Sequence, residues 1–173
     1  MRSLVRAAFV VAALTSVPAA GEPAKVEWQG LAIAYEPEVW RAEPPQGGAT
    51  LVLTCIAPDC RREPKVYAAA SQAPPPGAAV SSPFCSDHVG YRDARVLPLG
   101  TPTAGGIEFS ATSRWSGCRA RDAPILEACG EHGGTLYRLS TLIGEGCNFA
   151  PELPVDRFTA LLRGIRPVAS PPN

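Results

Sequence analysis

The sequence predicts an α+β domain in which an antiparallel sheet of about six or seven strands packs against two helices and is stabilised by disulfide bonds. Three observations support this fold class. Apolar and polar residues alternate in several short segments, as in half-buried strands. Two other segments carry helix start signals or helical spacing. Six cysteines occur in a chain of 173 residues, all beyond an N-terminal export signal.

The first twenty residues have the pattern of a cleavable secretory signal peptide. Arg2 and Arg6 precede an apolar run over residues 7–14, which is much shorter than the roughly twenty residues of a membrane span. Small residues follow, so we expect cleavage near Ala19 to Gly21. An uncleaved anchor or a buried N-terminal helix is the alternative. No other stretch is long and apolar enough to be a transmembrane segment.

The composition narrows the class of protein further. The 16 basic and 16 acidic residues cancel, which argues against a nucleic-acid-binding protein because such proteins need a basic surface. Arg far outnumbers Lys, and Ala and Pro are abundant. This bias is typical of GC-rich bacterial genomes, so we expect a periplasmic or secreted bacterial protein and not one of a eukaryotic extracellular space. The length predicts a single domain over residues 21–166, followed by a disordered tail over residues 167–173.

The cysteines indicate structural disulfides, because an even number in an exported chain is typical of a disulfide set. Six cysteines allow 15 pairings, which the sequence does not distinguish. Cys55 and Cys60 flank the turn-forming segment Ile-Ala-Pro-Asp, so we expect them to pair. Each bridge contributes roughly 2–4 kcal/mol. We therefore expect reduction to lower the melting temperature by more than about ten degrees.

The other four cysteines are assigned from the expected strands. Cys118 and Cys147 follow two strands that can end side by side in an antiparallel meander, which leaves Cys85 and Cys129 for each other. A metal site is the competing interpretation, because Cys85 lies three residues before His88. The paired short spacings of zinc sites are missing, so we expect no metal ligands and no cofactor.

The first half of the mature chain contains four predicted strands between Pro- and Gly-rich turns. Residues 31–35 alternate large apolar side chains with Ala, and residues 39–42 follow a Glu-Pro-Glu turn. Residues 50–55 alternate again, and residues 65–71 return as the second arm of a hairpin. A short helix over residues 83–91 comes next, because a Ser-Pro pair is typical of a helix start.

The second half predicts more strands and a closing helix. A brief strand at 95–97 precedes the clearest one, at 107–115, whose apolar and polar residues separate onto two faces. Strands at 124–129 and 135–143 are joined by a turn that contains Gly133 and Gly134. A helix then begins at Pro154 and ends near Gly164. Its apolar stripe comprises Val155, Phe158, Leu161, Leu162 and Ile165.

Three segments resemble PsbP-like domains. Residues 30–35, followed by Pro37 and Trp40, are similar to the opening strand, turn and Trp of that family. The strand at 135–143 and the helical segment at 158–162 resemble its closing strand and helix. The resemblance implies an αβα sandwich around an antiparallel sheet and a non-catalytic role as an accessory subunit of a larger assembly. The six cysteines depart from the family pattern, and no functional residue is transferred.

The sequence names no catalytic residue. His88 and His132 are the only histidines, and a His that activates a nucleophile needs it within about 3 Å. His88 lies beside Asp87 on a predicted helix, where adjacent residues do not face each other. Phosphate-binding and hydrolase motifs are missing as well.

A candidate binding surface lies on the polar face of the predicted sheet. Glu108 and Arg114 on one strand could neighbour Arg138 on another. Two guanidinium groups on one face can hold a carboxylate or an acidic partner. The alternative is an ordinary solvated face, on which a Glu–Arg pair contributes roughly 0–1 kcal/mol. Three tryptophans could form an aromatic cleft but are more often core residues: Trp28, Trp40 and Trp115.

Taken together, these features predict an exported, non-catalytic accessory or binding protein of the periplasm, with structural disulfides and a protein partner in the cell envelope. One alternative is a small secreted inhibitor of an envelope enzyme, which would use a protruding loop at residues 44–48 or 98–105. Another is a hydrolase or metalloprotein that uses His88, His132 or a free thiol.

Overall fold

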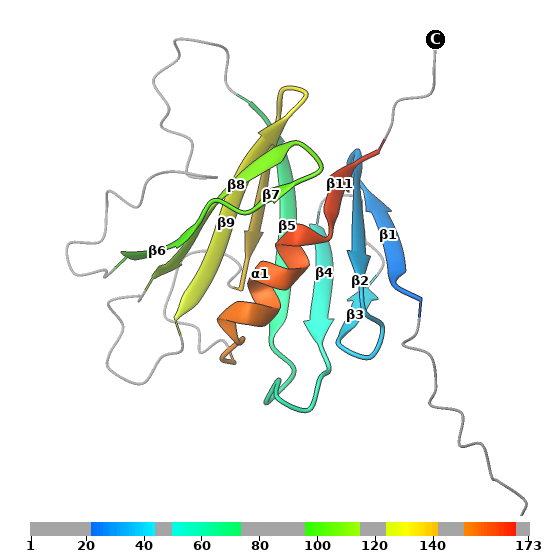
Figure 1. Cartoon of the computed structure of the whole chain (residues 1–173), viewed down its shortest axis with the longest axis vertical. Helices are drawn as coiled ribbons and strands as arrows, with labels where there is room; N and C mark the ends of the chain where they lie inside the picture. The colour runs from blue at the N-terminus through cyan, green and yellow to red at the C-terminus, as the bar shows by residue number, and fades with distance from the viewer. Residues whose placement is uncertain (1–21, 44–49, 74–95, 115–123, 142–150, 169–173) are drawn as a thin grey trace, which may run out of the picture.

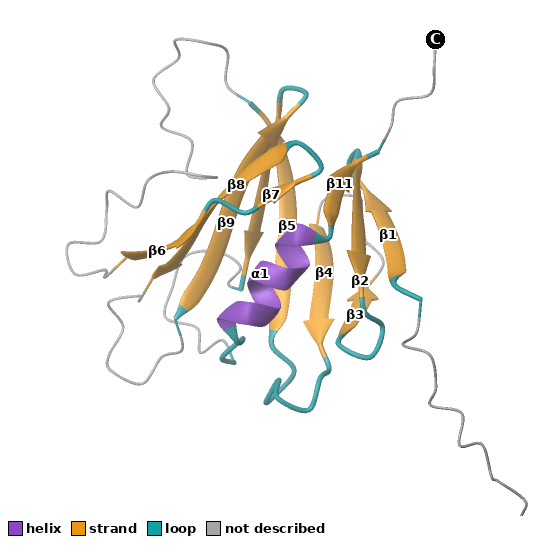
Figure 2. Cartoon of the chain, viewed as in Figure 1, coloured by secondary structure: helices purple, strands orange, loops and turns teal. Residues whose placement is uncertain are grey.

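The computed structural model describes residues 22–43, 50–73, 96–114, 124–141 and 151–168. In these residues a large antiparallel sheet carries a helix and a small sheet on one of its faces (Figure 1). Figure 2 shows that strands make up most of the described chain and that the helix lies across the large sheet. The hydrophobic core lies between the large sheet and these two covering elements.

The large sheet consists of two meanders that meet in its middle. Its strand order is β3-β4-β5-β10-β9-β8-β6, and β7 pairs with β8 beside this path. All these pairs are antiparallel, and β5 and β10, which are far apart in sequence, form the seam. The strands are β3 (Trp40–Glu43), β4 (Thr50–Cys55), β5 (Lys65–Gln72), β6 (Val96–Gly100), β7 (Thr103–Ala104), β8 (Ile107–Arg114), β9 (Ile125–His132) and β10 (Thr135–Ser140).

The small sheet joins the two ends of the described chain. β1 (Ala24–Trp28) and β2 (Leu31–Tyr35) form a hairpin, and β11 (Ile165–Pro167) pairs antiparallel with β2. The hairpin turn reaches the large sheet, because the Tyr137 hydroxyl donates a hydrogen bond of 2.8 Å to the Gln29 carbonyl. The Val168 N–H donates to the Gly30 carbonyl at 2.8 Å, so the sheet includes residues beyond the predicted domain end at 166.

The helix α1 (Val155–Arg163) lies where the sequence predicts it, with Pro154 before it and Gly164 after it. Phe158, Leu161 and Leu162 form its buried stripe. The prediction of two helices is not confirmed, because α1 is the one helix in the described part of the chain and the segment at 83–91 lies outside it. β1 was not predicted, since its alternation is carried by a single Val between two charged residues.

The core face of the large sheet follows from two-residue alternation. Phe109 is fully buried and packs over Gly130 on the neighbouring strand, where a Cβ would lie 2.9 Å from its ring. Gly130 therefore makes room for a large ring in the middle of the sheet. The tryptophans Trp28 and Trp40 are buried in this core, as predicted, and Trp115 lies outside the described residues. The other largest buried side chains are Leu31, Ile33, Leu51, Leu53, Ile107, Leu126, Leu139 and Ile165.

The predicted disulfide between Cys55 and Cys60 is confirmed, with 5.9 Å between the Cα atoms. Cys129 is also disulfide-bonded, to a partner outside the described residues. The other three cysteines, Cys85, Cys118 and Cys147, lie outside the described residues, so their predicted pairing stays a prediction.

Replacing both Cys55 and Cys60 with Ala will lower the free energy of unfolding by about 2 kcal/mol, the loop-closure value for so short a loop. Urea denaturation of the oxidised wild type and the double variant measures this difference. An unchanged midpoint would show that the bridge does not stabilise the fold.

Candidate functional site

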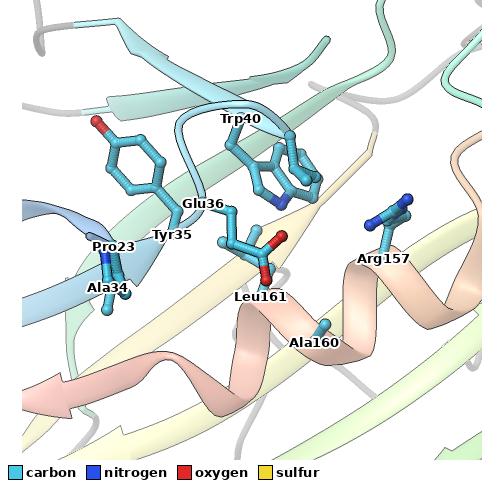
Figure 3. A pocket seen from close by; sticks show the side chains of 9 residues that line it. Pro23, Ala34, Tyr35, Glu36, Trp40, Arg157, Ala160 and Leu161 are labelled. Atoms are coloured by element: carbon cyan, nitrogen blue, oxygen red, sulfur yellow. The ribbon is translucent and has the colours of Figure 1, made fainter. Parts of the chain in front are cut away.

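A pocket of about 210 Å³ lies where the turn between β2 and β3 meets helix α1 (Figure 3). Apolar side chains form most of its wall, among them Val39, Trp40 and Leu161. Glu36 and Arg157 bring opposite charges to it from the turn and from the helix. The pocket is therefore an apolar hollow with a charged rim.

Local structure positions both walls. The N–H groups of Val39 and Trp40 donate to the Glu36 carbonyl at 2.9 and 2.8 Å, which folds the Glu-Pro-Glu segment into a turn. On the helix side, Arg157 and Leu161 are four residues apart and therefore lie on the same face of α1.

The loop closed by the Cys55–Cys60 disulfide supports the pocket from outside. The Ile56 N–H donates to the Val39 carbonyl at 2.8 Å. Asp59 accepts two hydrogen bonds from Arg157, at 3.1 Å from Nε and 3.3 Å from Nη2. The disulfide loop thus contacts the strand side and the helix side of the pocket.

Asp59 and Arg157 stabilise each other's charged forms. The hydrogen bond from Arg157 lowers the pKa of Asp59 below its usual value. The same bond raises the pKa of Arg157, and the negative charges of Asp59, Asp156 and Glu36 add to this effect. Three carboxylates therefore act on one guanidinium group at this end of the helix.

The Asp59–Arg157 pair will make stability depend on pH in the acid range. Because folding lowers the pKa of Asp59, its contribution is fully present above the usual pKa of 3.8 and is lost as the pH falls through the folded value. The stability difference between wild type and Asp59→Asn, measured by urea denaturation, should shrink from pH 7 to pH 3. With Arg157→Met as background, Asp59→Asn should have a smaller pH-dependent effect, because only a backbone hydrogen bond then lowers the pKa of Asp59. An equal effect in both backgrounds would contradict this assignment.

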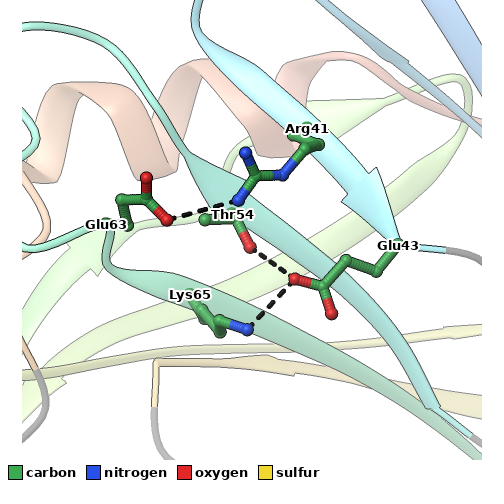
Figure 4. A network of polar contacts seen from close by, with 5 residues as sticks. All are labelled: Arg41, Glu43, Thr54, Glu63 and Lys65. Atoms are coloured by element: carbon green, nitrogen blue, oxygen red, sulfur yellow. Dashed lines mark hydrogen bonds and ion pairs between the residues drawn. The ribbon is translucent and has the colours of Figure 1, made fainter.

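A second polar group lies on the opposite face of the sheet, across β3, β4 and β5 (Figure 4). The Thr54 hydroxyl and the Lys65 ammonium each donate to the same Glu43 oxygen at 3.0 Å, and the Lys65 bond is the main reason that the pKa of Glu43 is lowered. Arg41 binds Glu63 at 3.2 Å. These charges are paired with each other along the sheet edge, so we assign them to the fold.

The predicted binding residues lie on two strands that are not neighbours in the sheet, and the binding surface stays a prediction. β9 lies between β8 and β10, so Glu108 and Arg138 are separated by a strand. Arg138 instead donates from Nη2 and Nε to one oxygen of Glu127, at 2.7 and 3.1 Å. Glu108 is exposed. Arg114 is paired with Ile125 in the strand register, and its side chain lies outside the described residues.

The two histidines belong to no metal-binding cluster among the described residues. His132 is exposed at the end of β9, and His88 lies outside the described residues. Within the described ranges no three His, Cys, Asp or Glu residues are grouped so that they could hold a metal ion. In the same ranges, no helix is long and apolar enough to cross a membrane.

Sequence reasoning missed the pocket because its two sides are 121 residues apart in the chain, Glu36 on one side and Arg157 on the other. The Glu-Pro-Glu segment predicts the turn, and the apolar spacing predicts the buried face of the helix. No sequence pattern predicts that the turn and the helix contact each other. One signal was available in the sequence. Glu36 and Glu38 come directly after a strand, and Pro37 between them carries no charge that could pair with either.

Among known proteins, the chain is similar to solved structures and not to a described family. No family model matches the chain, and no curated protein matches it. The chain is similar to the solution structure of cyanobacterial PsbP (CyanoP) from Synechocystis sp. PCC 6803, with a TM-score of 0.49 and 13% sequence identity. The similarity covers 91% of this chain and 99% of the other.

Proposed function

We propose that this chain is an exported, non-catalytic binding protein of the bacterial periplasm, and that it attaches to a protein partner through the pocket between the β2–β3 turn and α1. The observation that carries the proposal is the pocket itself. Its volume of about 210 Å³ is below the roughly 300–1,000 Å³ of sites for whole small molecules. A pocket of this size suits a single side chain of a partner protein.

Export is supported by the signal-peptide pattern of the first twenty residues and by the disulfide chemistry. Disulfides persist in oxidising compartments such as the periplasm and are rare in the cytosol. The Cys55–Cys60 bridge and the bonded Cys129 agree with such a location. N-terminal sequencing of the protein from a periplasmic fraction should give a start near Ala20 to Glu22; recovery of an uncleaved, reduced chain from the cytosol would contradict export.

A non-catalytic role is supported by the electrostatics of the carboxylates. Hydrogen bonds from basic residues lower the pKa of both Asp59 and Glu43, which favours their ionised forms. A carboxyl that acts as general acid near neutral pH needs the opposite shift. These two groups therefore behave as members of ion pairs.

Affinity capture from an envelope extract tests the proposed function. The bait is the mature wild-type protein, and Ala160→Trp is the blocked variant, because Ala160 is exposed and lines the pocket. Arg163→Trp is the matched control, since it adds the same ring to an exposed position of α1 outside the pocket lining. Thermal unfolding followed by circular dichroism checks that all three baits are folded.

We expect wild type and Arg163→Trp to retain the same partner and Ala160→Trp to lose it. Equal capture by all three folded baits would rule out this pocket as the attachment site. If the captured partner is an enzyme whose activity falls on binding, the inhibitor alternative gains support. Of the two loops considered for an inhibitor, residues 98–105 include the end of β6 and all of β7, both paired with β8, and so do not protrude freely.

A further inference from the structure

We propose that the pocket receives an Arg or Lys side chain of the partner protein, with the apolar stem against the pocket wall and the cationic end near Glu36. This inference rests on the proposed function, because it names the chemical group that the attachment site takes. Three observations support it: the charge around the pocket, an unused hydrogen-bond donor in its wall, and the shape of its lining.

The charge around the pocket favours a cation. Arg157 is the one basic residue that lines it, and Asp59 already binds that guanidinium group through two hydrogen bonds. Asp156 and Glu36 add two further negative charges that act on Arg157. The carboxylate of Glu36 makes no hydrogen bond or ion pair with any residue of the described ranges, so it is available to a ligand. The local balance is therefore negative, which complements a basic side chain.

Trp40 provides a donor inside the pocket. Its side chain is 4% exposed, and Figure 3 shows its indole nitrogen on the side of the ring that faces Glu36. Among the described residues this N–H has no hydrogen-bond partner, and it keeps contact with the open pocket, whereas the fully buried unpaired indole N–H is that of Trp28. An indole N–H that a ligand can reach is free to donate to an acceptor of that ligand. A backbone carbonyl of a bound polypeptide would provide one, while the aromatic ring can also attract a nearby cation.

The lining matches a side chain with an apolar stem and a charged end. Val39, Trp40 and Leu161 offer an apolar surface, and Glu36 lies at the rim. Arg and Lys place their methylene groups along such surfaces while their charge stays near water. A purely apolar side chain would leave Glu36 unpaired, and an acidic one would be repelled by it.

Peptide titration tests this assignment on the mature, full-length protein. The probes are blocked pentapeptides with a central Arg, Lys, Leu or Glu between alanines, added at millimolar concentration. The readout is the indole N–H resonance of Trp40 in a ¹⁵N–¹H correlation spectrum, assigned with Trp40→Phe. Glu36→Gln is the test variant, and Glu152→Gln, an exposed carboxylate outside the pocket lining, is its control.

We expect the Arg and Lys peptides to shift the Trp40 resonance and to bind about fivefold more tightly than the Leu peptide, as one ion pair would give. Glu36→Gln should remove this advantage, and Glu152→Gln should keep it. Equal binding of Leu and Arg peptides would overturn the basic occupant while leaving the pocket as the attachment site. A Trp40 resonance unmoved by every peptide would also overturn it. A failure of the proposed function would give a different result, namely equal capture of the partner by wild type and Ala160→Trp.

Discussion

Replacing Arg138 with Met will destabilise the protein by about 3 kcal/mol, because it removes a cation that makes two hydrogen bonds to a buried carboxylate. The Glu127 side chain is 6% exposed, and that of Arg138 is 21% exposed. Both guanidinium bonds end on the same Glu127 oxygen, the shorter at 2.7 Å. A carboxylate that loses its cation in such a position keeps its desolvation cost. Urea denaturation of the oxidised protein at neutral pH measures the change.

Two further variants separate this effect from an ordinary surface charge. Lys25 and Glu27 form an ion pair with both side chains more than half exposed, so Lys25→Ala should cost less than about 1 kcal/mol. The double variant Glu127→Leu/Arg138→Met should recover stability relative to Arg138→Met alone, since no carboxylate remains to be paired. A cost for Arg138→Met as small as that of Lys25→Ala would show that Glu127 does not depend on this cation.

The same pair shows what the sequence could not say about the surroundings of Arg138. Alternation in the sequence placed Glu108 and Arg138 on polar faces of their strands, but alternation does not give the order of strands in a sheet. β9 lies between β8 and β10, and it brings Glu127 beside Arg138. A buried acid–base pair has no distinctive sequence pattern, so Arg138 was indistinguishable from a solvated arginine. Strand order is therefore the information that the sequence lacked.

Other features were predictable because their causes are local. The hairpin turn at Gly133 and Gly134 has positive φ at both residues, as two adjacent glycines indicate. The Cys55–Cys60 bridge joins two cysteines that are five positions apart in the sequence. The Pro and Asp between them predict the turn that it closes. The buried stripe of α1 follows from helical spacing, except that Val155 is exposed at its first turn and Ile165 lies in β11 beyond the helix. The pocket needed a contact between distant segments, and no local pattern contains it.

Replacing Gly164 with Ala will also destabilise the protein by about 3 kcal/mol, for a steric reason. Gly164 has φ of −78°, so its backbone conformation does not require glycine. A Cβ at this position would overlap the carbonyl oxygen of Ala34 on β2. The obstacle is backbone, which cannot rotate away, and the Gly164 carbonyl accepts a hydrogen bond of 3.0 Å from the Ala34 N–H. The end of α1 must therefore move away from β2.

Gly106→Ala is the control that distinguishes this steric overlap from the backbone strain of placing Ala at a positive φ. Gly106 has φ of +89° and open space where a Cβ would lie, so its replacement should cost only about 1–2 kcal/mol. Ala34 and Leu161 line the pocket on the two sides of the contact that Gly164 allows. Gly164→Ala should therefore reduce partner capture under conditions where it is still folded, whereas Gly106→Ala should leave capture unchanged. Equal costs and equal capture for the two variants would show that the close contact between α1 and β2 neither stabilises the fold nor shapes the pocket.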